Sequence, residues 1–245
     1  MLTKLKKFTN LPLSRKLQFL SSTYHKLKTQ TFYKLMFKSM GKKSIIKKPM
    51  FLTPEYISIG NACYIWNDAR IEAITSYAND SFNPHIILED GVSFEQRCHI
   101  TAADTLTIGK DTAILFDVMI TNIDHEYEDL NLPVAKQPLK VSKTYIGENC
   151  FLGSGAKIQA GTILGKHCVV GTNAVVRGTF PDYSVIVGIP AKIVKRYDLE
   201  NDSVEQSNYH KEQSEKYRAL SDAEDSERSR IYRENRLKRN IQNLS

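Results

Sequence analysis

The side chains best suited to proton-transfer chemistry lie together in one short segment of the chain. This segment reads Thr121-Asn122-Ile123-Asp124-His125-Glu126-Tyr127. A neutral imidazole, with an ordinary pKa of about 6.5, can accept a proton near neutral pH, and a carboxylate can orient such a ring. Asp124 is adjacent to His125, and adjacent residues do not easily form that bond. Glu126 or a carboxylate from another subunit is therefore an equal candidate.

A repeat of six residues predicts the elements that position this cluster. Aliphatic residues recur at every sixth position in one uninterrupted run: Ile146, Leu152, Ile158, Leu164, Val170 and Val176. The same step occurs in three earlier triplets: Ile59, Ile65 and Ile71; Leu88, Phe94 and Ile100; Ile108, Ile114 and Ile120. A period of six matches neither a helix nor an alternating strand, and it is typical of a parallel β-helix with stacked coils. We therefore expect an all-β fold.

A second position of the repeat tests this register independently. Four residues after most of these aliphatic residues the side chain is small or β-branched: Cys63, Ala69, Thr75, Val92, Cys98, Thr112, Val118, Cys150, Ala156, Thr162, Cys168 and Ala174. The exceptions, Asp104, Asp124 and Phe180, fall in the third hexad of a triplet. If three hexads form one coil, the interruptions are loops at a corner, where functional residues concentrate. The sequence predicts a β-helix domain over residues 51–197 with a loop at 122–145.

All four cysteines occupy the small-residue position of the repeat. A cysteine there behaves as a compact apolar core residue. The chain has no CxxC motif and no signal peptide, and the cysteine spacing does not form a disulfide framework. We therefore expect free structural thiols, which fits a reducing cytoplasm.

The positive charge of the chain is concentrated at its N-terminus. The 245 residues carry a net charge of +7, and 41% of them are apolar, enough for one principal domain plus extensions. Residues 1–50 hold thirteen Lys or Arg and no Asp or Glu, so they contribute +13 and the remainder contributes −6. Apolar residues in this segment follow helical spacing at Leu13, Leu17, Leu20, Tyr24 and Leu27. The pattern predicts a basic amphipathic helical extension.

Two functions for this extension stay open. Its apolar stripe could lie on an anionic membrane surface, or it could cap the open end of the β-helix and leave the lysines in water. No run reaches the roughly 18 to 20 apolar residues that a membrane-crossing helix needs. Nucleic-acid binding is disfavoured, because no known binding fold accompanies the basic block and the remaining chain is acidic.

The C-terminal tail, residues 198–245, has a different composition. It is rich in Ser, Glu, Arg, Asn and Gln and contains neither Gly nor Pro. Such a segment is predicted to be a solvated helix or a disordered tail.

Three motifs connect the predicted coil to a known family. They are the pair Asp124-His125, the Gln-Pro-Leu of residues 137–139, and the closing Val-Gly-Ile-Pro-Ala-Lys-Ile-Val-Lys of residues 187–195. With the repeat, they resemble the hexapeptide-repeat acyltransferases, specifically the branch that O-acetylates sugars: galactoside, maltose and nodulation-factor acetyltransferases and their capsule and lipopolysaccharide relatives. The resemblance runs from about Ile57 to Arg196.

This resemblance implies a fold, an assembly and a reaction. The fold would be a left-handed β-helix, an exception to the usual right-handed crossover. It would assemble as a homotrimer with active sites between subunits, and acetyl-CoA would be the donor. His125 aligns with the catalytic histidine of the family, which implies general-base catalysis worth roughly 10² to 10⁴ in rate, with no acyl-enzyme.

The resemblance also implies the residues that contact the donor. A backbone N–H stabilises the developing oxyanion in the family, and the matching position is Ser154. Coenzyme A would lie along Thr172, Asn173 and Arg177, with its phosphates near Lys192 and Lys195. The pair Arg177-Gly178 replaces the Thr-Lys that is usual there, so the cation at the nucleotide end is open. Phe151 and Ala160 stand where Trp and Pro are common in the family. These differences concern packing and leave the mechanism unchanged.

Acceptor-binding candidates lie in the same loop and on the coil before it. In the loop they are Asn122 and Asp124. On the earlier coil Arg97 and His99 lie near the place where the family contacts its acceptor sugar. The resemblance implies no metal.

Two rival functions were weighed. A γ-class carbonic anhydrase shares the scaffold but needs three histidines on zinc. Leu130 and Ile120 stand where its characteristic second histidine would lie, so this function is rejected. The other rival is a noncatalytic β-helix scaffold, and it does not explain His125 in the loop.

The acceptor is left open among four kinds. A capsular or O-antigen glycan is favoured, because the basic N-terminus suits an enzyme that meets a lipid-linked glycan at the membrane. The alternatives are a soluble sugar, an amino-sugar nucleotide or an antibiotic. We expect a cytoplasmic enzyme, peripheral on the inner face of the bacterial cytoplasmic membrane.

Overall fold

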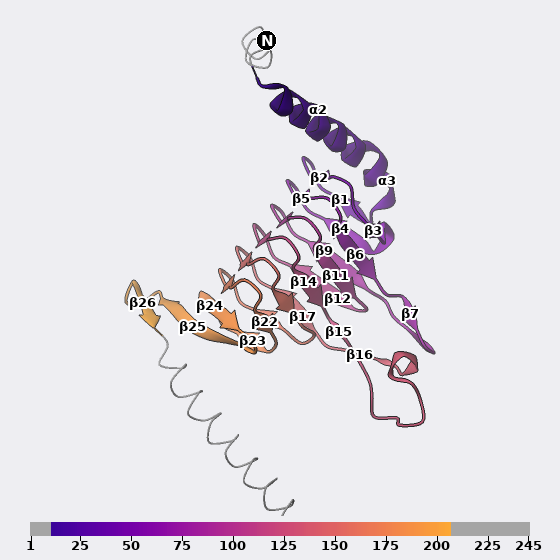
Figure 1. Ribbon diagram of the computed structural model, residues 1–245, viewed down its shortest axis with the longest axis vertical. Coiled ribbons are helices and arrows are strands. Elements are labelled where there is room, and N and C mark those ends of the chain that lie inside the picture. The colour runs from indigo at the N-terminus through magenta and orange to yellow at the C-terminus, as the bar shows by residue number, and fades with distance from the viewer. Residues whose placement is uncertain (1–10, 207–245) are drawn as a thin grey trace, which may run out of the picture. The chain divides into compact units, whose positions relative to one another are not determined.

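The computed structural model describes residues 11–206, which form a parallel β-helix preceded by a helix (Figure 1). The coil has three sheets, named A, B and C here. Sheet A contains β1 (Ser39–Met40), β4 (Ile57–Ile59), β9 (His85–Leu88), β12 (Thr105–Ile108), β17 (Thr144–Ile146), β20 (Ile163–Leu164) and β23 (Thr179–Phe180). Sheet B contains β2 (Ile45–Ile46), β5 (Tyr64–Ile65), β10 (Ser93–Phe94), β13 (Ala113–Ile114), β18 (Phe151–Leu152), β21 (Val169–Val170), β24 (Ser184–Gly188), β25 (Ala191–Asp198) and β26 (Ser203–Gln206). Sheet C contains β3 (Phe51–Leu52), β6 (Arg70–Ala73), β11 (His99–Ala102), β14 (Met119–Thr121), β19 (Lys157–Ile158) and β22 (Val175–Val176).

The remaining elements are helical segments and two hairpins. The helical segments are α2 (Leu13–Lys28), the π-helical turn η1 (Thr29–Tyr33), α3 (Lys34–Met36) and the 3₁₀ turns η2 (Pro54–Tyr56) and η3 (Val134–Lys136). The antiparallel hairpins are β7 (Ser76–Tyr77) with β8 (Asp80–Ser81), and β15 (Ile123–His125) with β16 (Leu139–Val141).

The strand register confirms the six-residue repeat. Leu152 pairs with Ile114 on the coil before it and with Val170 on the coil after it. All three side chains are at most 1% exposed. Each aliphatic residue therefore stacks on the same hexad position of the next coil, and the stack forms one continuous core.

A steric requirement explains the glycine that follows several of these aliphatic residues. At Gly147 an added Cβ would lie 2.5 Å from the carbonyl carbon and oxygen of Gly165 on the next coil. Backbone atoms cannot move away as a flexible side chain can, so only glycine fits this close approach.

The four cysteines are buried and free, as expected. Burial raises the pKa of the Cys63 thiol to about 11 and that of Cys98 to about 12. Thiols with such pKa values are protonated at neutral pH and react poorly. Their role in the core is packing.

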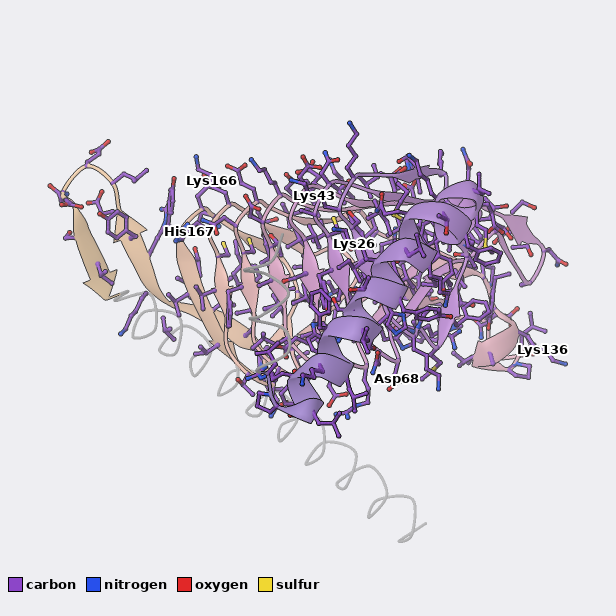
Figure 2. The ribbon with its side chains drawn as sticks, turned by 90° about the horizontal axis from the view of Figure 1, so that it is seen from above. Lys26, Lys43, Asp68, Lys136, Lys166 and His167 are labelled. Carbon is purple, nitrogen blue, oxygen red and sulfur yellow. The ribbon has the colours of Figure 1, made fainter. Side chains whose placement is uncertain are left out.

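The loops leave the coil where the repeat is interrupted. We call the turns from sheet A to B, from B to C and from C to A the first, second and third corners. Both hairpins are inserted at the third corner, between a strand of sheet C and the next strand of sheet A. Figure 2 shows Lys43 and Lys166, from first-corner turns, along one edge, and Lys136, in the long loop, away from it.

The β-helix begins earlier than the boundary predicted at residue 51. Strands β1 to β3 already form a coil, because Met40, Ile46 and Leu52 follow the same six-residue step. Gly41 stands after Met40 as Gly147 does after Ile146. Residues 1–50 are therefore part extension and part first coil.

The C-terminal boundary also differs from the prediction at residue 197. Strand β25 runs to Asp198 and pairs antiparallel with β24, and β26 lies next to β25 in sheet B. The predicted helical or disordered tail from residue 207 onward lies outside the described residues.

Candidate active site

The loop that carries His125 is anchored to the coil at its base. Its first strand, β15, pairs with β16 so that His125 lies opposite Leu139. Asn122 is fully buried, and its Oδ1 accepts a hydrogen bond from the Ala103 N–H at 2.9 Å. Its Nδ2 donates to the Asp104 carbonyl at 3.1 Å. Asn122 therefore fastens the loop, and the expectation that it binds an acceptor is wrong because burial withdraws its amide.

The Gln-Pro-Leu motif anchors the far side of the same loop. Gln137 is 2% exposed. Its Nε2 donates to the carbonyls of Asp129 and Leu132 at 2.8 and 3.0 Å, and its Oε1 accepts from the Asp129 N–H at 3.2 Å. A buried amide with both ends satisfied fixes the path of the surrounding backbone. This motif therefore shapes the loop.

An ion pair holds the loop strand beside His125. The Arg177 guanidinium donates to the Asp124 carboxylate at 2.5 Å, and both side chains are partly exposed, at 54% and 34%. Arg177 extends from the third corner, just after β22. Arg177, predicted to contact coenzyme A, and Asp124, predicted to contact the acceptor, thus contact each other. Together they position the strand that carries His125.

The His125 ring contacts an aromatic side chain from the other hairpin. The Tyr77 and His125 ring centroids lie 5.3 Å apart, with an angle of 71° between the planes. The His125 side chain is exposed, and neither Asp124 nor Glu126 bonds it in the described part of the chain. Neither carboxylate therefore orients it within one chain.

A second group of the expected residues meets in a hollow at the second corner. It has a volume of about 570 Å³ and is called the Ser154 groove here. It is lined by Arg97, His99, Phe116, Asp117, Met119, Ser154, Gly155, Lys157, Thr172 and Asn173. Ser154, Thr172 and Asn173 were predicted to contact coenzyme A, and Arg97 and His99 were predicted to contact the acceptor sugar. The structure brings both sets together in this groove. His125 does not line this groove, because it leaves the coil at a different corner.

The backbone of the groove offers unused hydrogen-bond donors. Phe116, Ser154 and Thr172 occupy the same turn position on successive coils. Across residues 11–206, their N–H groups donate no hydrogen bond, whereas the next residues along, Gly155 and Asn173, donate to the preceding coil at 2.9 Å. A ladder of free amides at a solvent-filled groove can bind a carbonyl or oxyanion.

The polar side chains of the groove are mutually oriented. Arg97 donates to the two Asp117 carboxylate oxygens at 2.7 and 2.5 Å, and these hydrogen bonds lower the pKa of Asp117. Lys157 Nζ donates to the Asp117 carbonyl at 2.8 Å. The groove therefore presents two oriented cations, which suits a ligand that carries phosphate.

The surroundings of His99 favour the neutral form of its ring. Its pKa is lowered by burial and by the nearby Arg70 charge. Its Nε2 lies 2.9 Å from the Thr101 hydroxyl. A neutral imidazole at the groove can exchange hydrogen bonds with a hydroxyl-bearing ligand.

Two residues expected to contact coenzyme A lie elsewhere. Lys192 and Lys195 are on β25, opposite Val187 and Val185 of β24. Neither lysine lines the Ser154 groove, and Lys195 borders a separate hollow of about 400 Å³. The predicted coenzyme residues are therefore divided between two places, because β25 pairs antiparallel with β24 at the end of sheet B.

Five residues of the groove were not predicted as site residues: Phe116, Asp117, Met119, Gly155 and Lys157. The hairpin residue Tyr77 was not predicted either. The repeat register contained the signal for two of the groove residues, since Phe116 matches Ser154 and Asp117 matches Asn173 in hexad position. Tyr77 lies in an insertion outside the repeat and had no such signal. Across the described residues, no cluster of three or more His, Cys, Asp or Glu has the geometry to hold a metal ion.

Comparison with known proteins identifies the class of protein to which this scaffold belongs. The bacterial transferase hexapeptide (six repeats) family matches residues 143–178. A lipopolysaccharide biosynthesis O-acetyl transferase of Escherichia coli K12, WbbJ, is 38% identical over 152 residues, which cover 56% of this chain and 78% of that protein. An acetyltransferase of Mycobacterium tuberculosis, Rv3034c, is 40% identical over 90 residues, which cover 36% of this chain and 30% of that protein.

A solved structure agrees on the fold. The N-acyltransferase AntD from Bacillus cereus superposes with a TM-score of 0.58 at 15% identity, over 79% of this chain and 96% of that one. The fold and the relatives together define an acetyltransferase on a left-handed parallel β-helix. The chain belongs to the bacterial hexapeptide-repeat transferase family.

Proposed function

We propose that the protein transfers an acetyl group from acetyl-CoA to a sugar hydroxyl of a lipopolysaccharide or capsular glycan. The observation that carries the proposal is the pairing of an exposed histidine loop with a groove of free amides and oriented cations on one hexapeptide scaffold. The relative WbbJ, named for lipopolysaccharide O-acetylation, supports the acceptor class.

The reaction is a direct transfer in this proposal. His125 accepts the proton of the acceptor hydroxyl as the oxygen attacks the thioester carbonyl carbon. Negative charge develops on the carbonyl oxygen, and the Ser154 N–H donates a hydrogen bond to it. The carbon–sulfur bond then breaks, and the imidazolium returns its proton to the thiolate of coenzyme A. Every proton and electron pair is thus accounted for without an acyl-enzyme.

The donor is proposed to lie in the Ser154 groove. The free N–H groups of Ser154 and Thr172 would donate hydrogen bonds to the amide and thioester oxygens of acetyl-CoA, and Arg97 and Lys157 would attract its phosphates. His99 would contact the acceptor at the edge of the groove. No metal takes part in this scheme.

The active site is proposed to form between subunits of a homotrimer. Within one chain His125 leaves the third corner, and Ser154 lies at the second corner. His125 does not line the groove that holds Ser154, so one chain presents two half-sites. Cyclic packing of three chains would bring the loop of one protomer to the groove of the next.

An acetyl-transfer assay tests the acceptor class. The full chain is incubated with acetyl-CoA, and release of free coenzyme A thiol is followed with a lipid-linked O-antigen oligosaccharide, the free monosaccharides and serine as acceptors. We expect thiol release with the oligosaccharide and an ester-linked acetyl group on its sugar by mass spectrometry. Serine is included because proteins named serine acetyltransferase match parts of this chain at 24–39% identity.

The other outcomes of the assay would contradict the proposal. Thiol release with serine alone would assign a small-molecule acceptor, and release with monosaccharides alone would assign a soluble sugar. Absence of coenzyme A binding in calorimetry would favour a noncatalytic scaffold.

A further inference from the structure

The apolar stripe of α2 lies exposed within the part of the chain that the structure describes. The helix buries none of its residues, and the stripe is exposed at every position: Leu13 72%, Leu17 57%, Leu20 55%, Tyr24 62% and Leu27 65%. Of the two functions left open for this helix, capping of the β-helix by the stripe is not what residues 11–206 show. Large leucine and tyrosine side chains that remain in water in a row mark an interaction surface.

The connection to the coil directs the stripe away from the protein. Thr29 is fully buried, and its hydroxyl accepts a hydrogen bond from the Ile46 N–H at 2.9 Å. Gln30 donates to the carbonyls of Gly41 and Ser44 at 3.1 and 3.0 Å. The helix is thus fastened at its C-terminal end. Thr29 lies on a different helical face from the stripe, and this end is where α2 meets the first coil (Figure 1).

The charges around the stripe are all positive. From residue 11 to residue 53 the chain has cations and no Asp or Glu: Arg15, Lys16, Lys26, Lys28, Lys34, Lys38, Lys42, Lys43, Lys47 and Lys48. Lys16 stands one turn before Leu20, and Lys28 stands one turn after Tyr24, so both lysines flank the stripe. Their long side chains can bury their methylene groups beside apolar neighbours and keep the ammonium at a polar boundary.

We infer that α2 lies flat on an anionic lipid surface, with its stripe among the acyl chains and its flanking lysines at the headgroups. Basic residues close to such a surface are attracted by its negative potential. A second copy of α2 is disfavoured as the occupant, because packing two stripes together would bring two sets of cations into contact. Within residues 11–206 no helix is long and apolar enough to cross the membrane, so the attachment is peripheral.

A vesicle-binding experiment with a matched pair of variants tests this inference. The full chain is sedimented with phosphatidylcholine vesicles that contain or lack phosphatidylglycerol. We expect binding only with phosphatidylglycerol, and weaker binding at high salt because exposed charges are screened. Leu20→Glu should weaken binding about tenfold or more, since it removes buried apolar area and adds a charge of the wrong sign. Ser22→Glu adds the same charge on the opposite face and should weaken binding far less.

Three results would overturn the inference. One is a full chain that does not bind the anionic vesicles, and another is equal loss in the two variants. The third is a change of oligomeric mass in Leu20→Glu, by light scattering, without lipid binding by the parent chain. That result would assign the stripe to a contact between subunits.

A different observation supports a second inference, which concerns Tyr77. This half-buried residue lies in the β7–β8 hairpin, and its hydroxyl donates to the Ala135 carbonyl of the histidine loop at 2.6 Å. The edge-to-face geometry of its ring with His125 falls in the favourable range for aromatic pairs. One side chain therefore contacts both the His125 ring and the loop that carries it.

We propose that Tyr77 is a positioning residue for His125, an assignment that rests on the proposed function. No carboxylate holds the ring in the described chain, so the Tyr77 contact is what restricts its orientation. A base that is displaced by a fraction of an ångström loses much of its effect, because proton transfer needs hydrogen-bond geometry.

Two substitutions at Tyr77 separate the roles of its ring and its hydroxyl. Tyr77→Leu removes both contacts and should lower kcat about tenfold, with the KM for acetyl-CoA within about twofold. Tyr77→Phe keeps the ring contact and should recover most of the loss. The pH profile of kcat/KM should move in Tyr77→Leu, since the surroundings of the base change. Tyr127→Phe, at an exposed tyrosine of the same loop, is the control.

The outcome distinguishes this inference from the proposed function. If the parent chain transfers no acetyl group, the proposed function fails. If the parent chain is active and both Tyr77 variants keep its kcat and pH profile, only the role of Tyr77 is refuted.

Discussion

Replacing His125 with alanine is expected to lower kcat/KM for acetyl transfer by at least about 100-fold. The imidazole is the only group proposed to take the proton of the acceptor, so its loss leaves water in that role. The affinity for coenzyme A should change little, because His125 does not line the Ser154 groove. Steady-state kinetics and calorimetry on the same preparation measure the two effects separately.

A control substitution at another histidine and a mixing experiment test whether the loss of activity is specific to His125. His167→Ala changes a histidine at the first corner, on another side of the coil, and should keep activity near that of the parent. Mixed trimers of His125→Ala with the groove variant Arg97→Glu should regain activity, since some sites would combine an intact loop with an intact groove. Near-normal turnover in a folded His125→Ala protein would remove His125 from its assigned role. Failure of the mixture, despite subunit exchange, would place the site within one chain.

Replacing Leu152 with alanine is expected to reduce the free energy of unfolding by about 2–5 kcal/mol. The side chain is fully buried between Ile114 and Val170 of adjacent coils. The spacing of these coils is set by backbone hydrogen bonds at about 4.8 Å, so the walls of the new cavity cannot collapse. Urea titration followed by circular dichroism measures the loss.

An exposed leucine is the control for the stability experiment. Leu130 is 94% exposed in the long loop, and Leu130→Ala should change the free energy of unfolding by no more than about 0.5 kcal/mol. Equal losses in the two variants would contradict the assignment of Leu152 to the stacked core.

The sequence by itself determined the coil, the small-residue positions and the place of the loops. Each coil repeats the same environment every six residues, so the inward position must be filled again by an aliphatic side chain and the small position by Cys, Ala, Thr or Val. A repeated environment leaves a periodic signal along the chain. The same period is present at Met40, Ile46 and Leu52, which form the first coil within the segment predicted as the extension.

Only the tertiary structure decided which functional candidates meet. The contacts of Arg177 with Asp124 and of Tyr77 with Ala135 join residues 53 and 58 positions apart. They depend on the paths of two insertions at the third corner, and no period constrains those paths. The burial of Asn122 and the antiparallel pairing of β25 with β24 likewise depend on tertiary packing. A side chain's chemistry can be read from its type, but its partner depends on how the loops pack, which is set by hydrogen bonds and contacts between segments distant in sequence.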